Sequence, residues 1–262
     1  MLPARRAGRQ RGARGIEALK AQLDTKAGQE PATAIPLVRA ALKDKATLAP
    51  ADTLWLLSHL SEALRRNKQL DEALLVAREG QAAAGKNPRE QVRFGRLVTL
   101  LLHDAVKDPA AIREFEKIAP LLPDLAKPES TKASKLVAAD AWRMGGIVLT
   151  SLGQLPEAMD LLMRALRIYD ANDDQEFEQV DCLNAIALVH FKTGLGWKKH
   201  CAEVDRSIQI AAKAKMSDAL SRGYLRKSHF LSTMPTGSTS STRPCCRRAR
   251  SRSRRKTTTT WR

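Results

Sequence analysis

The sequence predicts an all-α fold, a right-handed superhelix in which antiparallel helix pairs stack as a solenoid. Of the 262 residues, 43% are hydrophobic but only 4% are aromatic, so the core must be built from Leu, Ala, Val and Ile. One unit recurs along the chain, an amphipathic helix joined by a short polar turn to a second amphipathic helix. Pro88, Pro109 and Pro156 lie near expected helix starts, where the missing N–H costs nothing.

The elements are expected in a simple order. Residues 1–14 carry five arginines and no acid, and are predicted to be a disordered basic N-terminus. Residues 15–122 hold helix pairs one to three, and residues 123–130 are the expected linker. Residues 131–231 hold pairs four and five and half of a sixth. Residues 232–262 form a second disordered basic tail.

The clearest copy of the unit runs from Ala139 to Asp170. Its residues at relative positions 4, 8, 11, 15, 20, 24 and 27 are Trp142, Gly146, Leu149, Gly153, Ala158, Leu162 and Ala165. This pattern resembles the tetratricopeptide repeat (TPR) signature. Small residues at positions 8 and 20 let two antiparallel helices approach, and the glycine at position 15 ends the first helix in a left-handed conformation.

The second-helix anchor at position 20 can be followed through five copies. It falls at Ala34, Ala73, Ala111, Ala158 and His200, with separations of 39, 38, 47 and 42 residues. These separations exceed the usual 34 residues of the family, so we expect extended helices or linkers. The fifth copy also needs one inserted residue before His200.

The resemblance implies a protein–protein interaction or sensory scaffold and not an enzyme. Long-period repeats with acidic turns are also similar to the sensor arrays of bacterial signalling proteins such as diguanylate cyclases, here without a catalytic domain. The chain is therefore interpreted as a fragment of a longer bacterial signalling protein, truncated or frameshifted. No cofactor is implied, and the oligomeric state stays open.

In TPR folds, first-helix positions 2, 5, 9, 12 and 13 face a concave groove, and here they are rich in arginine. The predicted partner-binding residues are Arg65, Arg66, Arg93, Arg96, Arg143, Asn184 and Lys192. Their side chains are expected to receive a protein or peptide, of acidic character because guanidinium groups bind carboxylates bidentately. The alternative interpretation is an ordinary solvated helix face that happens to be charged.

The net charge of +17 raises a second hypothesis, a nucleic-acid-associated adaptor that acts through its Arg-rich tails. Residues 1–14 and 235–262 carry fourteen of those charges, so the body is almost balanced. The sequence also favours an accidental origin for the tail. Read in a shifted frame, the codons of Arg243–Arg262 encode residues similar to a further repeat. The basic charge of the tail is then an accident of the frame, so nucleic acid is not an expected partner.

No catalytic constellation is apparent. Cys182 and His190 lie eight residues apart on one helix, about 12 Å at 1.5 Å per residue, too far for a thiol–imidazole pair. A hydrolase hidden in the helical array is a weak third hypothesis. The four cysteines show no metal or disulfide spacing, so no metal site and a reducing compartment are predicted. No run is long enough to span a membrane and no signal peptide is recognisable, so a cytoplasmic location is expected.

Overall fold

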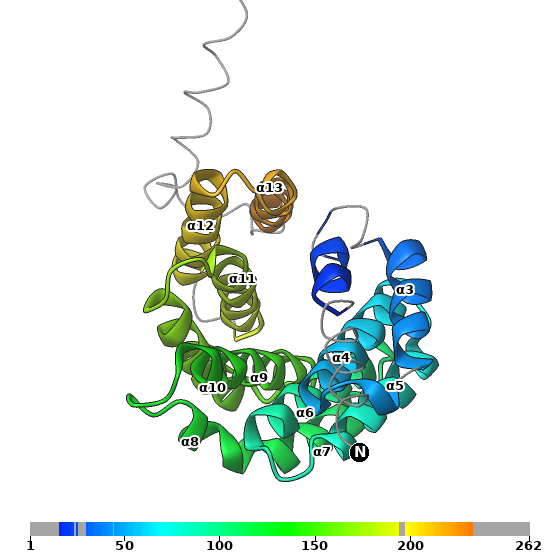
Figure 1. Cartoon of the computed structure of the whole chain (residues 1–262). Helices are drawn as coiled ribbons and strands as arrows, with labels where there is room; N and C mark the ends of the chain where they lie inside the picture. The colour runs from blue at the N-terminus through cyan, green and yellow to red at the C-terminus, as the bar shows by residue number, and fades with distance from the viewer. Residues whose placement is uncertain (1–15, 24, 26–29, 44, 194–196, 233–262) are drawn as a thin grey trace, which may run out of the picture. The chain divides into compact units, whose positions relative to one another are not determined.

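A computed structural model describes residues 16–23, 25, 30–43, 45–193 and 197–232 of the chain. Over these ranges every regular element is helical and no strand occurs, which confirms the all-α prediction (Figure 1). None of the helices in this described part is both long and apolar enough to cross a membrane. The chain divides into two compact units, Met1–Asp173 (unit 1) and Asp174–Arg262 (unit 2). Two basic segments, 1–14 and 232–262, were predicted to be disordered; Ser232 ends a helix, and the rest of both segments lies outside the described residues.

Unit 1 consists of helix pairs in chain order. A helical segment at residues 16–23 is followed by α3 (Pro31–Lys43) and the short η1 (Lys45–Thr47). Two further pairs are α4 (Pro50–Arg66) with α5 (Leu70–Ala83), and α6 (Pro88–Asp104) with α7 (Asp108–Ile118). The short η2 (Ala119–Leu121) and α8 (Leu122–Leu125) precede the last pair, α9 (Lys132–Ser151) with α10 (Leu155–Asp170). In each pair the two helices pack on one another.

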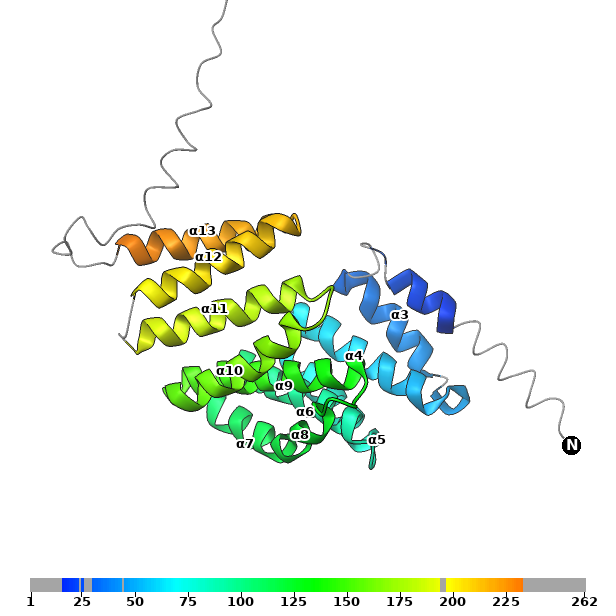
Figure 2. The ribbon, with the colours of Figure 1, turned by 90° about the vertical axis from the view of Figure 1, so that its left-hand side faces the viewer.

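Unit 2 continues the same alternation. It contains α11 (Glu176–Lys192), α12 (Trp197–Lys213) and α13 (Ser217–Ser232). Helix α12 packs on both neighbours, and Figure 2 shows the three helices side by side. Helix α13 is the expected half pair, and it exposes Tyr224 and Leu225.

In the second, fourth and fifth copies, position 8 of the first helix contacts position 20 of the second. In the second copy, Ser61 Oγ donates to the carbonyl oxygen of Ala73 at 2.9 Å. In the fourth copy, a Cβ added to Gly146 would lie 3.1 Å from the carbonyl oxygen of Ala158, so only a small residue fits. Ala158 and Ala165 are fully buried, and Trp142 is nearly so.

The fifth copy shows how the inserted residue is accommodated. Nδ1 of His200, at position 20, lies 2.7 Å from the carbonyl oxygen of Ala187, at position 8. The hydrogen bond therefore joins positions 8 and 20 across a sequence separation of thirteen residues, against twelve for Ser61 and Ala73.

Four helix ends share one backbone motif. After α9, Gly153 takes φ +79°, and the N–H groups of Gly153 and Gln154 donate to the carbonyls of Thr150 and Leu149. A residue in the same left-handed conformation follows three other helices: Lys68 after α4, Val106 after α6 and Lys215 after α12. This is the Schellman motif, which satisfies carbonyl groups that a helix end leaves open.

The 47-residue spacing between Ala111 and Ala158 has a local cause. Helices η2 and α8 are inserted after α7, and α9 extends to 20 residues. The expected linker, 123–130, overlaps the end of α8, whose Leu125 is buried. Helix α9 packs on α6, α7 and α8, and the boundary between the two compact units falls later, after Asp173.

Candidate partner-binding surface

The predicted binding residues all lie on the first helices of their pairs. In unit 1, α4 contacts α6 and α6 contacts α9, so these three helices form a continuous layer. We call its outward stripe the first-helix face of unit 1, defined by Arg65, Arg66, Arg93, Arg96 and Arg143. The remaining two predicted residues, Asn184 and Lys192, lie on α11 of unit 2.

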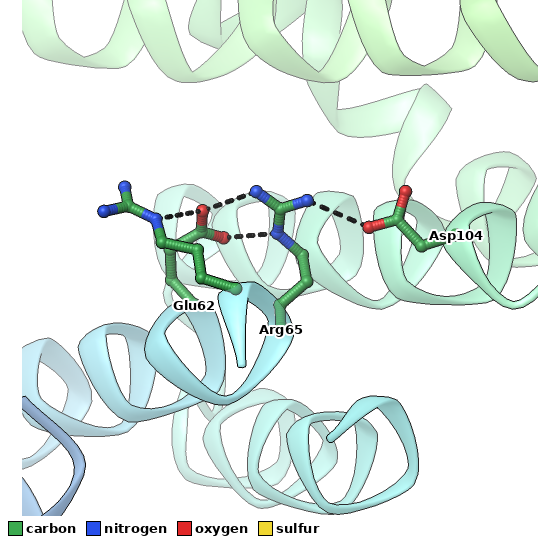
Figure 3. A network of polar contacts seen from close by, with 4 residues as sticks. Glu62, Arg65 and Asp104 are labelled. Carbon is green, nitrogen blue, oxygen red and sulfur yellow. Dashed lines mark hydrogen bonds and ion pairs between the residues drawn. The ribbon is translucent and has the colours of Figure 1, made fainter. Parts of the chain in front are cut away.

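Arg65 is already bound by two carboxylates. Its Nε and Nη2 donate to Glu62 at 2.9 and 2.7 Å, and its Nη1 donates to Asp104 Oδ2 at 2.9 Å (Figure 3). Arg66 Nε also donates to Glu62, at 3.3 Å. The hydrogen bond to Glu62 is the main cause of a raised Arg65 pKa, and the Asp104 carboxylate raises it further. Arg65 thus ties α4 to the end of α6.

The partners of Arg65 could have been found in the sequence. Glu62 stands three residues earlier on the same helix, where side chains meet. Asp104 stands 39 residues later, within one residue of the 38-residue spacing between the second and third anchors. In a stack of repeats, residues one period apart are lateral neighbours. Arg65 and Asp104 therefore neutralise one another across two copies.

Helix α6 has a different charge balance. Arg89, Arg93 and Arg96 follow the i, i+4, i+7 spacing of one helix stripe. Arg93 is partly buried and pairs with Glu90 at 3.2 Å. Arg96 is half-buried, and no carboxylate among the described residues lies within ion-pair distance of it. Burial is the main cause of a lowered Arg93 pKa. The charges of Arg96 and Arg89 lower this pKa further, against the opposing effect of Glu90.

On α9, Arg143 belongs to a buried polar cluster. Tyr169 of α10 is fully buried and its hydroxyl donates to Asp140 Oδ1 at 2.6 Å. Arg143 Nε donates to the Tyr169 oxygen at 3.4 Å, and its Nη2 lies 3.9 Å from Asp140. Burial, and then the Asp140 charge, raise the pKa of Tyr169 well above its usual value. These contacts hold the side chain of Arg143 in place within the first-helix face of unit 1.

One feature of this face was missed by the sequence analysis. Trp55 and His59 of α4 stack with ring centroids 3.8 Å apart, and His59 Nδ1 lies 3.0 Å from the Trp55 carbonyl oxygen. Lys20 Nζ lies 5.7 Å from the centre of the Trp55 ring and bonds to Asp52 at 3.1 Å. The i, i+4 spacing of the two rings on one helix is visible in the sequence, but neither residue is among the predicted binding residues.

Comparison with known proteins bears on the fold. No family model matches the chain, and no curated protein sequence matches it. Solved structures do match it, among them the following two. BtubC (BKLC) from P. vanneervenii is 16% identical over 82% of this chain and 93% of its own, with a TM-score of 0.57. A putative kinesin light chain from P. anserina with nearly identical TPR-like repeats, solved as a point variant, is 16% identical over 79% and 97%, with a TM-score of 0.56.

The chain has a TPR-like fold. The pairs that the sequence signature predicted are therefore TPR-like pairs, and their first helices carry the predicted binding residues. At this level of identity the likeness concerns the fold alone.

In the TPR-like pair of unit 2, two cysteines and one histidine lie inside the protein. Cys182, Cys201 and His200 are buried, and the ring of His200 lies 5.9 Å from that of Phe191. Within the described ranges, no group of three or more His, Cys, Asp or Glu side chains could hold a metal ion.

Proposed function

We propose that the chain is a protein-interaction module whose first-helix face in unit 1 binds an acidic segment of a partner protein. The TPR-like fold supports a binding role, because stacked helix pairs present a long surface built from their first helices. The observation that carries the acidic character is Arg96, a half-buried arginine beside Arg93 without a carboxylate of its own among the described residues.

The contrast with Arg65 explains why the site centres on α6. Arg65 has a hydrogen-bonded carboxylate on each side, so a ligand would have to displace Glu62 or Asp104. Glu90 pairs with Arg93 and not with Arg96, which leaves positive charge in a partly desolvated place. An incoming carboxylate would offset that charge, and a planar guanidinium can hold it by two parallel hydrogen bonds.

Two other interpretations remain predictions. A role in a bacterial signalling protein rests on the sequence resemblance alone. The nucleic-acid hypothesis rests on arginines at residues 1–14 and 235–262, which lie outside the described residues. The arrangement of Arg93 and Arg96 favours the acidic peptide, because these two side chains lie on a folded helix.

The test measures binding of a fluorescent acidic peptide, a Glu/Asp-rich dodecamer, by anisotropy in a salt titration. Replacing Arg93 and Arg96 by Ser should weaken binding at least tenfold, about 1.4 kcal/mol. The matched control replaces Arg113 and Arg164, two arginines on second helices, and should change binding less than twofold. A third variant replaces the arginines from 243 to 262 by Ser.

The variants separate the hypotheses. Loss of binding in the Arg93/Arg96 variant alone supports the first-helix face. Loss in the tail variant, with binding intact after the changes at Arg93 and Arg96, would contradict the proposal and favour a polyanion-binding tail. Circular dichroism of each variant establishes that the helices are retained.

A further inference from the structure

Helix α11 exposes an apolar stripe that the first-helix face of unit 1 lacks. Phe177, Leu188 and Phe191 are 51%, 45% and 46% exposed. With Asp181 and Asn184 they follow the spacing i, i+4, i+7, i+11, i+14, which places all five on one side of the helix, over about 21 Å. Helices α4, α6 and α9 expose no large apolar side chain among their described residues.

Most of the stripe lies apart from the residues by which α11 packs in unit 2, although the ring of Phe191 lies 5.9 Å from that of His200 on α12. Val180 packs with Ala211 and Ala219, and Ala187 packs with Val204 and Ile208. Helix α11 therefore has one apolar side for its own unit and a second apolar side in contact with solvent. A contiguous apolar side of a helix that stays exposed marks an interaction site.

The two ends of the stripe are symmetric about Asn184, whereas Asp181 lies three residues before it and Leu188 lies four residues after it. Phe177 and Phe191 each lie seven residues from it, and Glu176 and Lys192 each lie eight residues from it. If a second α11 is laid antiparallel across a two-fold axis at residue 184, Phe177 faces Phe191 of the second copy. Glu176 then faces Lys192 of the second copy, so both ends carry opposite charges.

Asn184 is the residue on the axis, and one polar atom of its side chain lacks a hydrogen-bond partner. Its Oδ1 is shielded from solvent and accepts no hydrogen bond from any residue that the structure describes. A buried polar atom without a partner is costly, whereas two asparagines that meet at an axis can donate to one another after a rotation of the amide. One asparagine within an apolar helix seam also fixes register and the number of strands.

We infer that the α11 stripe is a docking surface for a second copy of this chain, which binds through an antiparallel α11–α11 seam centred on Asn184. The seam is short, and Asp181 interrupts it, so the dimer is expected to be reversible and to form at micromolar concentrations. This inference does not depend on the acidic-peptide site, which lies on α6 in unit 1.

Sedimentation velocity of the full chain over a concentration series from about 1 to about 300 µM tests the inference, a range that brackets the micromolar dissociation constant expected of a short seam. The wild type should pass from monomer to dimer. Replacing Phe177 and Phe191 by Ser should weaken dimerisation at least tenfold. The matched control, Leu75→Ser, removes an exposed leucine from α5 in unit 1 and should leave the dimer unchanged.

Four further variants distinguish the seam from a folding defect. Glu176→Lys and Lys192→Glu should each weaken the dimer, and the double variant should restore it, because the charge pair is reversed but kept. Asp181→Leu extends the apolar stripe and should tighten the dimer at least tenfold. A wild type that stays monomeric at the highest concentration overturns the inference. So does a dimer that survives the Phe177/Phe191 changes, or one that is unaffected by Asp181→Leu.

Discussion

Val106 stands where a glycine would fit better, and replacing it should stabilise the protein. It follows α6 with φ +58°, and its side chain is 86% exposed, so it contributes little burial. A β-branched residue in the left-handed region costs about 1–2 kcal/mol, while glycine there costs up to about 1 kcal/mol through the unfolded chain. Val106→Gly should therefore raise the free energy of unfolding by about 0.5–1.5 kcal/mol.

Urea unfolding followed by far-ultraviolet circular dichroism measures this change. The backbone hydrogen bonds of the motif, from Val106 and Lys107 to the carbonyls of His103 and Leu102, are unaffected by the substitution. Gly153→Val is the reverse experiment at the equivalent position and should lower stability by about 1–2 kcal/mol. Lys68→Gly should give a smaller gain, because lysine is not β-branched. If Val106→Gly has no effect and Gly153→Val is also neutral, the assigned role of these helix ends is refuted.

Two predictions concern the packing between helices. Ala158→Leu should lower the stability of the protein by about 1–3 kcal/mol, because Ala158 is fully buried against Gly146. Thermal unfolding measures this loss, with Ala82→Leu at an exposed position as the control. Glu114 is buried and accepts hydrogen bonds from Arg78 at 2.7 and 2.8 Å. Glu114→Gln should therefore lower the free energy of unfolding by about 1 kcal/mol at neutral pH, a value reduced because Arg78 is partly exposed. The contact with Arg78 lowers the Glu114 pKa, so this difference should shrink as pH falls below about 4.5, and an unchanged difference at about pH 3 would contradict it.

The helix pairs were predictable because their signals are local. Small residues at two positions mark the second and fourth pairs, and α6, α7 and α10 begin with proline in their first turn. The left-handed helix ends were recognised only at Gly153, because Lys68, Val106 and Lys215 carry no such signal in their side chains. There the hydrogen bonds of the helix end impose the conformation whatever residue is present.

The charge balance of the candidate site was harder to predict. The sequence shows where arginines lie on a helix, but whether each is neutralised depends on the next copy in the stack. Arg65 meets Asp104 because the two stand about one period apart. Arg96 has Arg143 one period later on α9, at a spacing of 47 residues, and therefore receives no carboxylate from that side.

The same rule yields a test of the proposed function. Ser58 lies on α4, one period of 38 residues before Arg96, and α4 contacts α6. Ser58→Glu should supply Arg96 with the internal carboxylate that Asp104 supplies to Arg65. A half-exposed pair of this kind should add up to about 1 kcal/mol of stability. It should also weaken acidic-peptide binding about fivefold, because the peptide must displace the new carboxylate.

Stability and binding should thus change in opposite directions, which a general loss of structure does not produce. Ser58→Gln introduces a side chain of the same size as glutamate but without its charge. It should leave both stability and peptide affinity unchanged, so any effect of Ser58→Glu is due to the charge. Thermal unfolding and peptide anisotropy on the same samples measure the two effects. If Ser58→Glu stabilises the protein but leaves peptide affinity equal to that of Ser58→Gln, the new carboxylate pairs with Arg96 without affecting peptide binding. The acidic segment would then bind elsewhere, and the centre of the site on α6 would be wrong.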